Sequence, residues 1–390
     1  MKRLLSFLCA VLAGSVLGVA GAEPVPILSL PGSGTDPEAI DYAALPTLPG
    51  RHAVVRHFGT ELKFQLHNYL IHHDGHFWCL WSNGPEVEDL PGQEVWFATS
   101  VDGMDWSAPQ SVTGPPAEGR AYIARGLWLR EGRLLALVAS FKGHGAFGVD
   151  KDLQLQAWAW NPAMSAWAFE GKLFDDAINN FPPQRLASGD WIATRRDSRF
   201  NVFVLIGGRQ SLSDWESFEV TRRGAVPGFS PDEPIFWQLP GDASLFALYR
   251  DNGGSSRLFH SVSGDEGRHW TAPQLTNFPN ASSKLFSLQT SRGYRVLINN
   301  ANPKLARREL HLSVSEDGRT FTRLARLDIP APPQTEAMGT LWPKFRKGIA
   351  SLQYPHAIEH DGQLWIAFSR LKWQTEVFAV PLDSIDALRQ

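Results

Sequence analysis

Arginine, asparagine and carboxylate side chains recur in this 390-residue chain at the ends of short apolar segments. In chain order they are His67, Asn68, Tyr69 and Ser82; Arg125 and the stretch 142–144; Asn179, Asn180 and the stretch 195–197; Asp232, Glu233 and the stretch 250–252; Lys284, Asn299 and Asn300; and Tyr354, His356 and Arg370. So many polar groups would be costly in a closed core. Gathered at the mouth of a solvated pocket, they would suit an anion or a sugar, which such groups hold through charged hydrogen bonds.

A repeated unit in the sequence could bring these groups together. The unit is a glycine-containing turn followed by an apolar, β-rich strand that ends in polar residues, as in a β-hairpin. Its turns are Asp74-Gly75, Glu131-Gly132, Ser188-Gly189, Pro240-Gly241, Arg292-Gly293 and Asp361-Gly362. Regular repetition of one such unit along the chain is typical of propeller blades. The sequence therefore predicts an all-β, six-bladed β-propeller, in which the inner strands of all blades converge on one axis.

A second motif lies in register with the first. Ser263, Asp265, Gly267 and Trp270 fit the pattern Ser-x-Asp-x-Gly-x-x-Trp, and related versions begin at Ser100 and Ser315. We expect a hairpin turn between a blade's outer strands, with the Asp and Ser side chains bonded to local backbone and the glycine at positive φ. The expected role of these Asp boxes is structural.

The two ends of the chain suggest its organisation. Lys2 and Arg3 precede the apolar run 4–19, and a small-x-small cleavage pattern follows at 20–22, so residues 1–22 are expected to be a cleaved signal peptide. A retained N-terminal anchor is the alternative. The product would be secreted or periplasmic. Residues 23–50 form a Pro-rich segment expected on the surface, and 51–390 the propeller catalytic domain. The strand near 376–380 is expected to pair with that near 53–57 and close the ring.

Composition argues against several other classes of function. The net charge of −3 gives no electrostatic reason to expect a nucleic-acid partner, and no later segment is expected to insert stably in a membrane. Cys79 alone remains after signal removal, and its apolar surroundings suggest a buried, inert thiol. The histidines His72, His73 and His76 lie on a hairpin turn without an obvious carboxylate partner, so neither a metal nor a cofactor is expected. The oligomeric state is left open.

Three segments resemble the sialidase superfamily, whose propellers carry BNR, or Asp-box, repeats. The segment 232–250 resembles the sialidase run that opens with Asn-Glu and closes on an active-site arginine. The segment 300–315 resembles the run that carries another arginine of the active-site triad. The segment 353–362 resembles the closing segment with the nucleophilic tyrosine. At the level of the fold, the resemblance covers nearly all of the chain after the signal peptide.

The resemblance implies a role for four residues. Tyr354 would be the nucleophile, Glu233 its proton acceptor, and Arg250 and Arg307 would hold the substrate carboxylate. Sialidases are glycosidases that use tyrosine. Because their anomeric carbon carries a carboxylate, a neutral phenol with a pKa of about 10 avoids the repulsion that an anionic nucleophile would meet. The phenol then needs a neighbouring base, and arginine binds carboxylate through paired hydrogen bonds.

The chain departs from the sialidase pattern in blade one. Where sialidases have the arginine of an Arg-Ile-Pro motif, this sequence has His67, so one arm of the triad is missing unless Arg125 or Arg370 replaces it. The other substrate-binding candidates near the same strand ends are Arg196, Asn180, Asp251 and His356.

The acid–base aspartate of sialidases has no clean match either. The loop after blade one's second strand offers Glu86, Glu88 and Asp89 as the carboxylic acid. The favoured function is an exo-acting glycosidase of sialidase type that removes a terminal acidic sugar from a glycan. The alternatives are a hydrolase or lyase acting on uronate-containing polysaccharide, with His67, His144 or His356 as the base beside Tyr354, and a non-catalytic carbohydrate-binding propeller.

Overall fold

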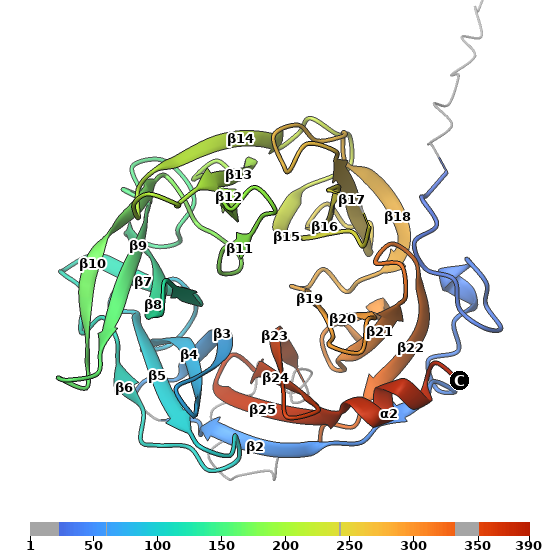
Figure 1. The fold of residues 1–390 in the computed structure, drawn as a ribbon, viewed down its shortest axis with the longest axis horizontal. Coiled ribbons are helices and arrows are strands. Elements are labelled where there is room, and N and C mark those ends of the chain that lie inside the picture. The colour runs from blue at the N-terminus through green and yellow to red at the C-terminus, as the bar shows by residue number, and fades with distance from the viewer. Residues whose placement is uncertain (1–22, 60, 242, 332–350) are drawn as a thin grey trace, which may run out of the picture.

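The computed structural model describes residues 23–331 and 351–390, apart from positions 60 and 242. The predicted signal peptide, residues 1–22, lies outside the described residues. Within them the strands form six sheets arranged as blades around one axis, as Figure 1 shows, and the six-bladed propeller predicted from the turn repeat is confirmed. No helix in these ranges is long and apolar enough to cross a membrane.

Blades one to four each consist of four consecutive strands, of which the first lies nearest the axis and the fourth lies outermost. Blade one contains β3 (Phe64–His73), β4 (His76–Gly84), β5 (Glu94–Ser100) and β6 (Gln110–Ser111). Blade two contains β7 (Arg120–Arg130), β8 (Arg133–Lys142), β9 (Gln154–Asn161) and β10 (Ala166–Asp175). Blade three contains β11 (Gln184–Arg185), β12 (Trp191–Arg196), β13 (Val202–Gly207) and β14 (Trp215–Thr221). Blade four contains β15 (Pro231–Gln238), β16 (Leu245–Asp251), β17 (Arg257–Ser263) and β18 (Gln274–Pro279).

Blades five and six combine strands from both ends of the chain. Blade five contains β19 (Phe286–Gln289), β20 (Arg295–Asn299), β21 (His311–Ser315), β22 (Phe321–Leu327) and the short parallel strand β1 (Thr47–Leu48). Blade six contains β23 (Leu352–His360), β24 (Gln363–Arg370), β25 (Gln374–Pro381) and, outermost, β2 (Arg51–Arg56). Among the described residues, the helical segments are η1 (Pro37–Ala39), η2 (Pro303–Leu305) and α2 (Leu382–Ala387).

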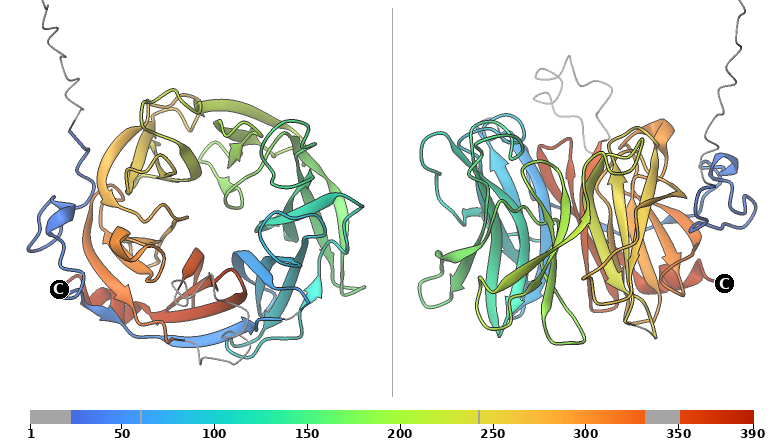
Figure 2. Two further views of the ribbon diagram at one scale, coloured as in Figure 1. Left: turned by 180° about the vertical axis from the view of Figure 1, so that it is seen from behind. Right: turned by 90° about the horizontal axis from the view of Figure 1, so that it is seen from above.

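The ring closes as expected from the sequence. Strand β2 pairs antiparallel with β25, with Val54 opposite Glu376. Because the first long strand completes the last blade, the two ends of the propeller are joined by backbone hydrogen bonds. Figure 2 shows the closed ring from behind and from the side. This closure removes the sheet edge that an open array would expose.

The Pro-rich segment before β2 does more than lie on the surface. It forms isolated parallel bridges, between Val25 and Thr276 and between Leu28 and Phe321. The carboxamide oxygen of Asn277 accepts hydrogen bonds from the backbone N–H groups of Ile27 and Leu28, each at 2.9 Å. The segment is therefore fastened to the outer strands of blades four and five.

The two turn motifs occupy the positions predicted for them. Each of the six glycine turns joins the first and second strands of a blade, and each Asp box joins the third and fourth. In blade four, Asp265 Oδ1 accepts a hydrogen bond from the His269 backbone N–H at 2.8 Å, and Ser263 Oγ accepts one from Gly267 N–H at 2.9 Å. The Trp270 indole N–H donates to the Gly267 carbonyl at 2.8 Å. The motif therefore stabilises the outer hairpin, and it contributes no group to the axis.

Apolar side chains fill the space between neighbouring blades. One such layer, between blades one and six, contains Cys79, Trp81 and Trp365. Cys79 is fully buried, and burial raises the pKa of its thiol. The expectation of a buried thiol is confirmed, and its raised pKa disfavours the reactive thiolate.

Candidate active site

Three candidate residues occupy the same structural position in different blades. His67, Glu233 and Tyr354 lie near the starts of the innermost strands β3, β15 and β23, with φ of 59°, 40° and 59°. At each of them one extra residue interrupts the pairing with the second strand, which is a β-bulge. Non-glycine residues rarely adopt positive φ, and those that do concentrate at functional sites. Each bulge turns its side chain away from the direction that the regular alternation of side chains along a strand would give it.

The candidate residues gather in one cluster near the axis, and within it Glu233 and Arg250 form a buried ion pair. Arg250 Nη1 donates to Glu233 Oε2 at 2.7 Å. Burial opposes ionisation of Glu233, but the charges of Arg250, Lys284 and Arg196 outweigh it and lower its pKa to about 2. Glu233 is therefore a carboxylate at neutral pH, and its charge is already balanced by a guanidinium group.

Tyr354 is buried close to the same charges. Burial raises the pKa of its phenol well above 10, the charges of Glu233 and Glu88 raise it further, and those of Arg250 and Arg307 act in the opposite direction. A direct hydrogen bond between Tyr354 and Glu233 was expected. None joins them in the described structure, because Arg250 holds the Glu233 carboxylate. The phenol is therefore neutral and lies within the electrostatic reach of its predicted base.

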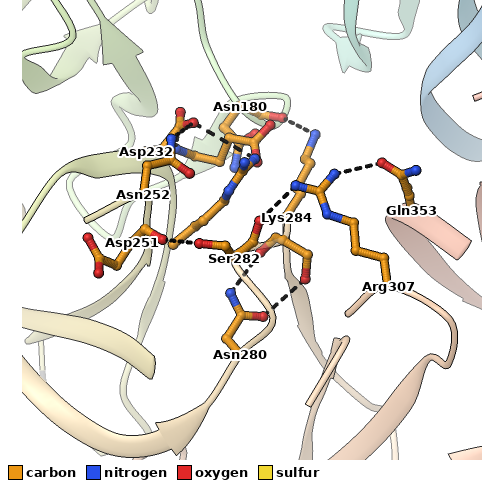
Figure 3. Close-up of polar contacts among 12 residues, drawn as sticks. Asn180, Asp232, Asp251, Asn252, Asn280, Ser282, Lys284, Arg307 and Gln353 are labelled. Carbon is orange, nitrogen blue, oxygen red and sulfur yellow. Dashed lines mark hydrogen bonds and ion pairs between the residues drawn. The ribbon is translucent and has the colours of Figure 1, made fainter. Parts of the chain in front are cut away.

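Arg307 points into the cluster while its neighbour Arg308 is exposed. Its Nη1 donates to Gln353 Oε1 at 2.6 Å, and its Nη2 donates to the Ser282 carbonyl at 2.7 Å. Figure 3 shows Arg307 between Gln353 and Ser282. Burial and the nearby charge of Arg250 lower the pKa of Arg307. Two arginines from different blades thus lie close together, although the chain between them is long.

His67 replaces the expected arginine and forms a chain with Ser82 and Glu88. His67 Nδ1 lies 3.0 Å from Ser82 Oγ, and Nε2 lies 3.3 Å from Glu88 Oε1. Burial and the charge of Arg125 lower the pKa of His67 to about 3, so the ring is neutral. Burial opposes ionisation of Glu88, but the contacts with His67 and Lys372 outweigh burial and lower the pKa of Glu88. Its carboxylate is therefore ionised and only accepts hydrogen bonds. We therefore assign the proton to Nε2 and a hydrogen bond from Ser82 to Nδ1.

Asp89 differs from its acidic neighbours in the same loop. Burial and the charge of Glu88 raise its pKa to about 6, although Arg125 acts in the opposite direction. Its Oδ1 is buried and has no hydrogen-bond partner among the described residues. Glu88 is an ionised partner of His67 and Lys372, and Glu86 is an exposed partner of Lys63 at 3.3 Å. Of the three predicted acids, Asp89 is the one suited to carry a proton near neutral pH.

Lys284 is a buried cation at the base of the cluster. Its Nζ donates to Tyr69 Oη at 3.0 Å and to the Asn180 carbonyl at 3.2 Å, and it lies 5.4 Å from the centre of the Tyr354 ring. Burial lowers its pKa well below the usual value, while Glu233 raises it. Figure 3 shows Lys284 beside Asn180. The nucleophile candidate therefore has the Lys284 amine over its ring and the Glu233 carboxylate nearby.

Arg196 belongs to a second ion pair next to the first. It is buried and pairs with Asp232, which also accepts from Asn252 Nδ2 at 2.7 Å. Burial lowers the pKa of Arg196 to about 10. Arg125 is buried too, and its Nε and Nη1 have no partner in the described structure.

Three of the predicted substrate-binding residues have other partners. The guanidinium group of Arg370 forms a buried two-point ion pair with Glu376, at 2.6 and 2.7 Å. The His356 ring is buried among aromatic side chains, and its Nδ1 accepts from the Leu70 backbone N–H at 3.1 Å. The Asp251 carboxylate accepts from three backbone N–H groups of the loops around it. These contacts help to stabilise the fold around the site, and the binding of substrate by these three residues stays a prediction.

Lys372 was missed by the sequence reasoning. It contacts Glu88 from the turn after β24, where Leu371 and Lys372 both have positive φ. The candidates on the second strand of each blade lie at its end, and in blade six that strand ends at Arg370. Extending the candidate region two residues beyond the strand would have found Lys372.

The histidine cluster on the first turn has no arrangement typical of a metal site. In the described ranges, no group of three or more His, Cys, Asp or Glu side chains is placed to hold an ion. The rings of His72 and His360 stack at 3.6 Å across blades one and six. His76 Nδ1 lies 2.8 Å from the Asp74 carbonyl. These rings therefore contribute to packing at the seam.

Comparisons with known families agree with this description. The model of a BNR repeat-like domain matches residues 178–366, which span blades three to six. No curated protein sequence is significantly similar to the chain.

Solved structures show the same fold at low sequence identity. A Dyadobacter fermentans protein of unknown function shares 13% identity at a TM-score of 0.66, with 85% of this chain and 97% of that chain covered. A Hadza microbial sialidase shares 13% identity at a TM-score of 0.65, with 85% and 69% covered. A Trypanosoma rangeli sialidase in complex with sialic acid shares 13% identity at 0.62, with 88% and 60% covered. The fold resemblance to sialidases predicted from the sequence is confirmed.

Proposed function

We propose that this propeller of the sialidase-like, BNR-repeat superfamily is an exported, exo-acting glycosidase that removes a terminal acidic sugar from glycans. The observation that carries the proposal is the contrast between two carboxyl groups: Glu233, whose charge acts on the buried Tyr354, and Asp89, which follows Glu88 in the blade-one loop, have pKa values moved in opposite directions. The pKa of Glu233 is lowered to about 2 and that of Asp89 is raised to about 6. Such a separation assigns one group as a base and the other as an acid.

The first step forms a bond between Tyr354 Oη and the anomeric carbon. Glu233 accepts the phenolic proton, the glycosidic carbon–oxygen bond breaks, and Asp89 gives its proton to the leaving oxygen. In the second step water attacks the anomeric carbon and the bond between that carbon and Tyr354 Oη breaks. Asp89 takes a proton from the water, and Glu233 returns the proton to the Tyr354 oxygen. The configuration at the anomeric carbon is retained, because two displacements occur.

The acidic group of the substrate explains how the Glu233–Arg250 pair could open. The charges of Arg250 and Arg307 both lower the pKa of Tyr354, so both guanidinium groups lie within electrostatic reach of the phenol. A substrate carboxylate bound between them would share the charge of Arg250, which at rest is directed to Glu233. That exchange would release Glu233 to accept the proton of Tyr354. Binding of the correct acidic sugar thus prepares the base for the reaction.

A second candidate function has one observation in its favour. The neutral ring of His67 lies edge-on to Tyr354, with centroids 5.0 Å apart. If Nδ1 exchanged its hydrogen bond with Ser82 for the substrate, this ring could abstract the proton next to a uronate carboxylate, and the leaving oxygen would then depart by elimination. This lyase would yield an unsaturated sugar, whereas the glycosidase would release a saturated one.

The test is a screen of glycans that end in different acidic sugars, with the released sugar identified by mass spectrometry. Tyr354→Phe should lose most of the turnover and keep the melting temperature of the wild type, and Tyr122→Phe on β7 serves as the control. An undiminished rate in Tyr354→Phe would rule out the nucleophile. An unsaturated product that disappears in His67→Ala would establish the lyase instead.

A further inference from the structure

A lysine at the seam between blades one and six contacts the candidate active site from its rim. Lys372 lies in the turn between β24 and β25, and its ammonium group pairs with Glu88 in the loop after β4. The Lys372 side chain is 33% exposed and the Glu88 side chain 25%, so the pair lies where the cluster meets solvent. The proposed catalytic steps use neither residue.

The turn that carries Lys372 is held against blade one. Leu371 and Lys372 both have a φ of 62°, which side chains of this size rarely adopt. The Lys372 carbonyl accepts a hydrogen bond from the Gln65 backbone N–H at 2.7 Å, and the Gln65 carboxamide oxygen accepts one from the Thr375 backbone N–H at 3.1 Å. Gln65 lies on β3, the strand that also carries His67. These contacts fix the turn to that strand and maintain its unfavourable backbone conformation.

Contacts lead from Lys372 to the candidate nucleophile in two steps. The two oxygens of Glu88 have different partners, since Oε2 pairs with Lys372 and Oε1 lies 3.3 Å from His67 Nε2. The His67 ring in turn lies edge-on to the Tyr354 ring. Without Lys372, rotation of the Glu88 carboxylate would no longer be restrained by its second oxygen. Lys372 therefore fixes the orientation of Glu88, and Glu88 fixes that of His67.

The charge of Glu88 acts on the nucleophile. Burial and the charges of Glu233 and Glu88 raise the pKa of Tyr354, so both carboxylates oppose the release of the phenolic proton. Glu233 has its counter-ion in Arg250, and Glu88 has its counter-ion in Lys372. Lys372 therefore reduces the electrostatic cost of the attack by Tyr354.

The proposed acid, Asp89, is affected by the same lysine. Burial and the charge of Glu88 raise the pKa of Asp89 to about 6. The cations that act in the opposite direction come from three other elements: Arg125 on β7, Lys372 after β24 and Arg196 on β12. Removing the positive charge of Lys372 would favour the protonated, neutral form of Asp89 and raise its pKa further.

We propose that Lys372 is a positioning residue of the proposed glycosidase, which holds Glu88 against His67 and supplies a counter-charge for both the nucleophile and the acid. An ion pair that only joined two surface loops would not change the ionisation of the groups that react. The inference rests on the proposed function for its catalytic part, whereas the coupling between Lys372 and His67 can be measured without a substrate.

The kinetic experiment compares the wild type, Lys372→Met and Lys372→Arg on the glycan that the screen identifies, from pH 4 to 9. Lys372→Met should lower kcat on the order of tenfold with little change in KM, the effect expected for one uncompensated charge in a partly buried site. The descending limb of kcat/KM, which Asp89 sets near pH 6, should move to higher pH, because a positive charge near the acid is removed. Lys372→Arg should keep both properties, since it retains the charge.

Lys63→Met is the matched control. Lys63 pairs with Glu86 in the same loop at 3.3 Å, and 67% of the Glu86 side chain is exposed. Its kinetics should match the wild type, and all three variants should keep a melting temperature close to that of the wild type, because ion pairs open to solvent contribute little to stability. The inference is overturned if Lys372→Met changes kcat and the descending limb no more than Lys63→Met does, or if it raises KM alone.

An NMR titration separates the failure of this inference from the failure of the proposed function. Labelling with ¹⁵N-histidine reports the His67 ring, whose signal is identified by its absence in His67→Gln. In the wild type, burial and the charge of Arg125 lower the pKa of His67 to about 3. In Lys372→Met the ring should take up its proton at a higher pH, because the charge of Glu88 then acts on His67 alone, whereas Lys63→Met should titrate as the wild type does.

The two experiments have distinct outcomes. If the wild type cleaves no glycan, the proposed function fails, and the titration alone decides whether Lys372 is coupled to His67. A His67 titration that is the same in Lys372→Met as in the wild type would overturn the inference, whatever the enzyme cleaves.

Discussion

Replacing Asp89 with asparagine tests the assignment of the acid most directly. Asparagine keeps the size of the side chain but cannot transfer a proton. Because general acid catalysis contributes a factor of roughly 10² to 10⁴, turnover of a glycan with a poor leaving group should fall by about that amount. An aryl glycoside, whose leaving oxygen needs little protonation, should be cleaved at nearly the wild-type rate.

The pH dependence gives the second part of this prediction. Asp89 must be protonated to act as the acid, and burial beside Glu88 raises its pKa to about 6. In the wild type, kcat/KM for the glycan should therefore fall about tenfold per pH unit above that value. The descending limb should disappear in Asp89→Asn.

The stability of the fold should respond to the same substitution. The folded-state pKa of Asp89 is raised from 3.8 to about 6, so its favourable contribution is complete below pH 3.8 and is lost as the pH rises through 6. The difference corresponds to at most about 3 kcal/mol. Asp89→Asn should therefore raise the free energy of unfolding at pH 8 by up to that amount, and change it little below pH 4.

The assays are steady-state kinetics on the two substrates from pH 4 to 9 and urea denaturation at both ends of that range. Glu86→Gln is the control, since Glu86 lies in the same loop with 67% of its side chain exposed. Equal losses on the glycan and on the aryl glycoside would refute the role of Asp89 as the acid, as would a descending limb that persists near pH 6 in Asp89→Asn.

Arg370→Met should destabilise the fold by about 3 kcal/mol in chemical denaturation, because it removes the guanidinium partner of the buried Glu376 carboxylate and leaves only His52 and Gln374 against it; a specific rise in KM at unchanged stability would instead show that Arg370 binds the substrate. Gly103→Ala should lower stability by about 1–3 kcal/mol, since a Cβ there would lie 2.3 Å from the Trp365 ring; an unchanged melting temperature would contradict tight packing of this Asp box. Secreted protein should begin at or near Glu23 on N-terminal sequencing, whereas an intact leader on a cytoplasmic product would contradict export.

The architecture could be predicted because its signals are local. A hairpin turn needs a residue that tolerates positive φ, and Gly75, Gly132 and Gly362 mark such turns in the sequence. An Asp box satisfies its own backbone, as Asp265 does, so its residues must be close together in the chain. The attachment of residues 23–48 to blades four and five was not predicted. It uses backbone pairing with β18 and β22 and the side chain of Asn277, all of which are distant in sequence.

The location of a candidate side chain could be predicted where the same strand position recurs from blade to blade. Whether that side chain is free to bind could not be predicted, because this depends on its contacts with neighbouring strands. Tyr354 and Glu233 were placed correctly near the axis because each begins an innermost strand. Arg370 also ends a strand next to the axis, but Glu376 on the neighbouring strand takes up its guanidinium group. Sequence position gives the direction of a side chain, whereas its availability depends on contacts across the sheet.

The shared bulge explains how a repeated fold produces an asymmetric site. Proline follows both Glu233 and Tyr354, and it suits a position where no backbone N–H is needed for the ladder. The backbone thus presents one side chain in a similar way in each of blades one, four and six, and the identity of that side chain decides the chemistry. His67 holds this position in blade one, where it faces Tyr354 as a neutral ring. A change of residue there would alter the charge offered to the substrate and leave the strand in place, so substrate preference within this fold can vary independently of stability.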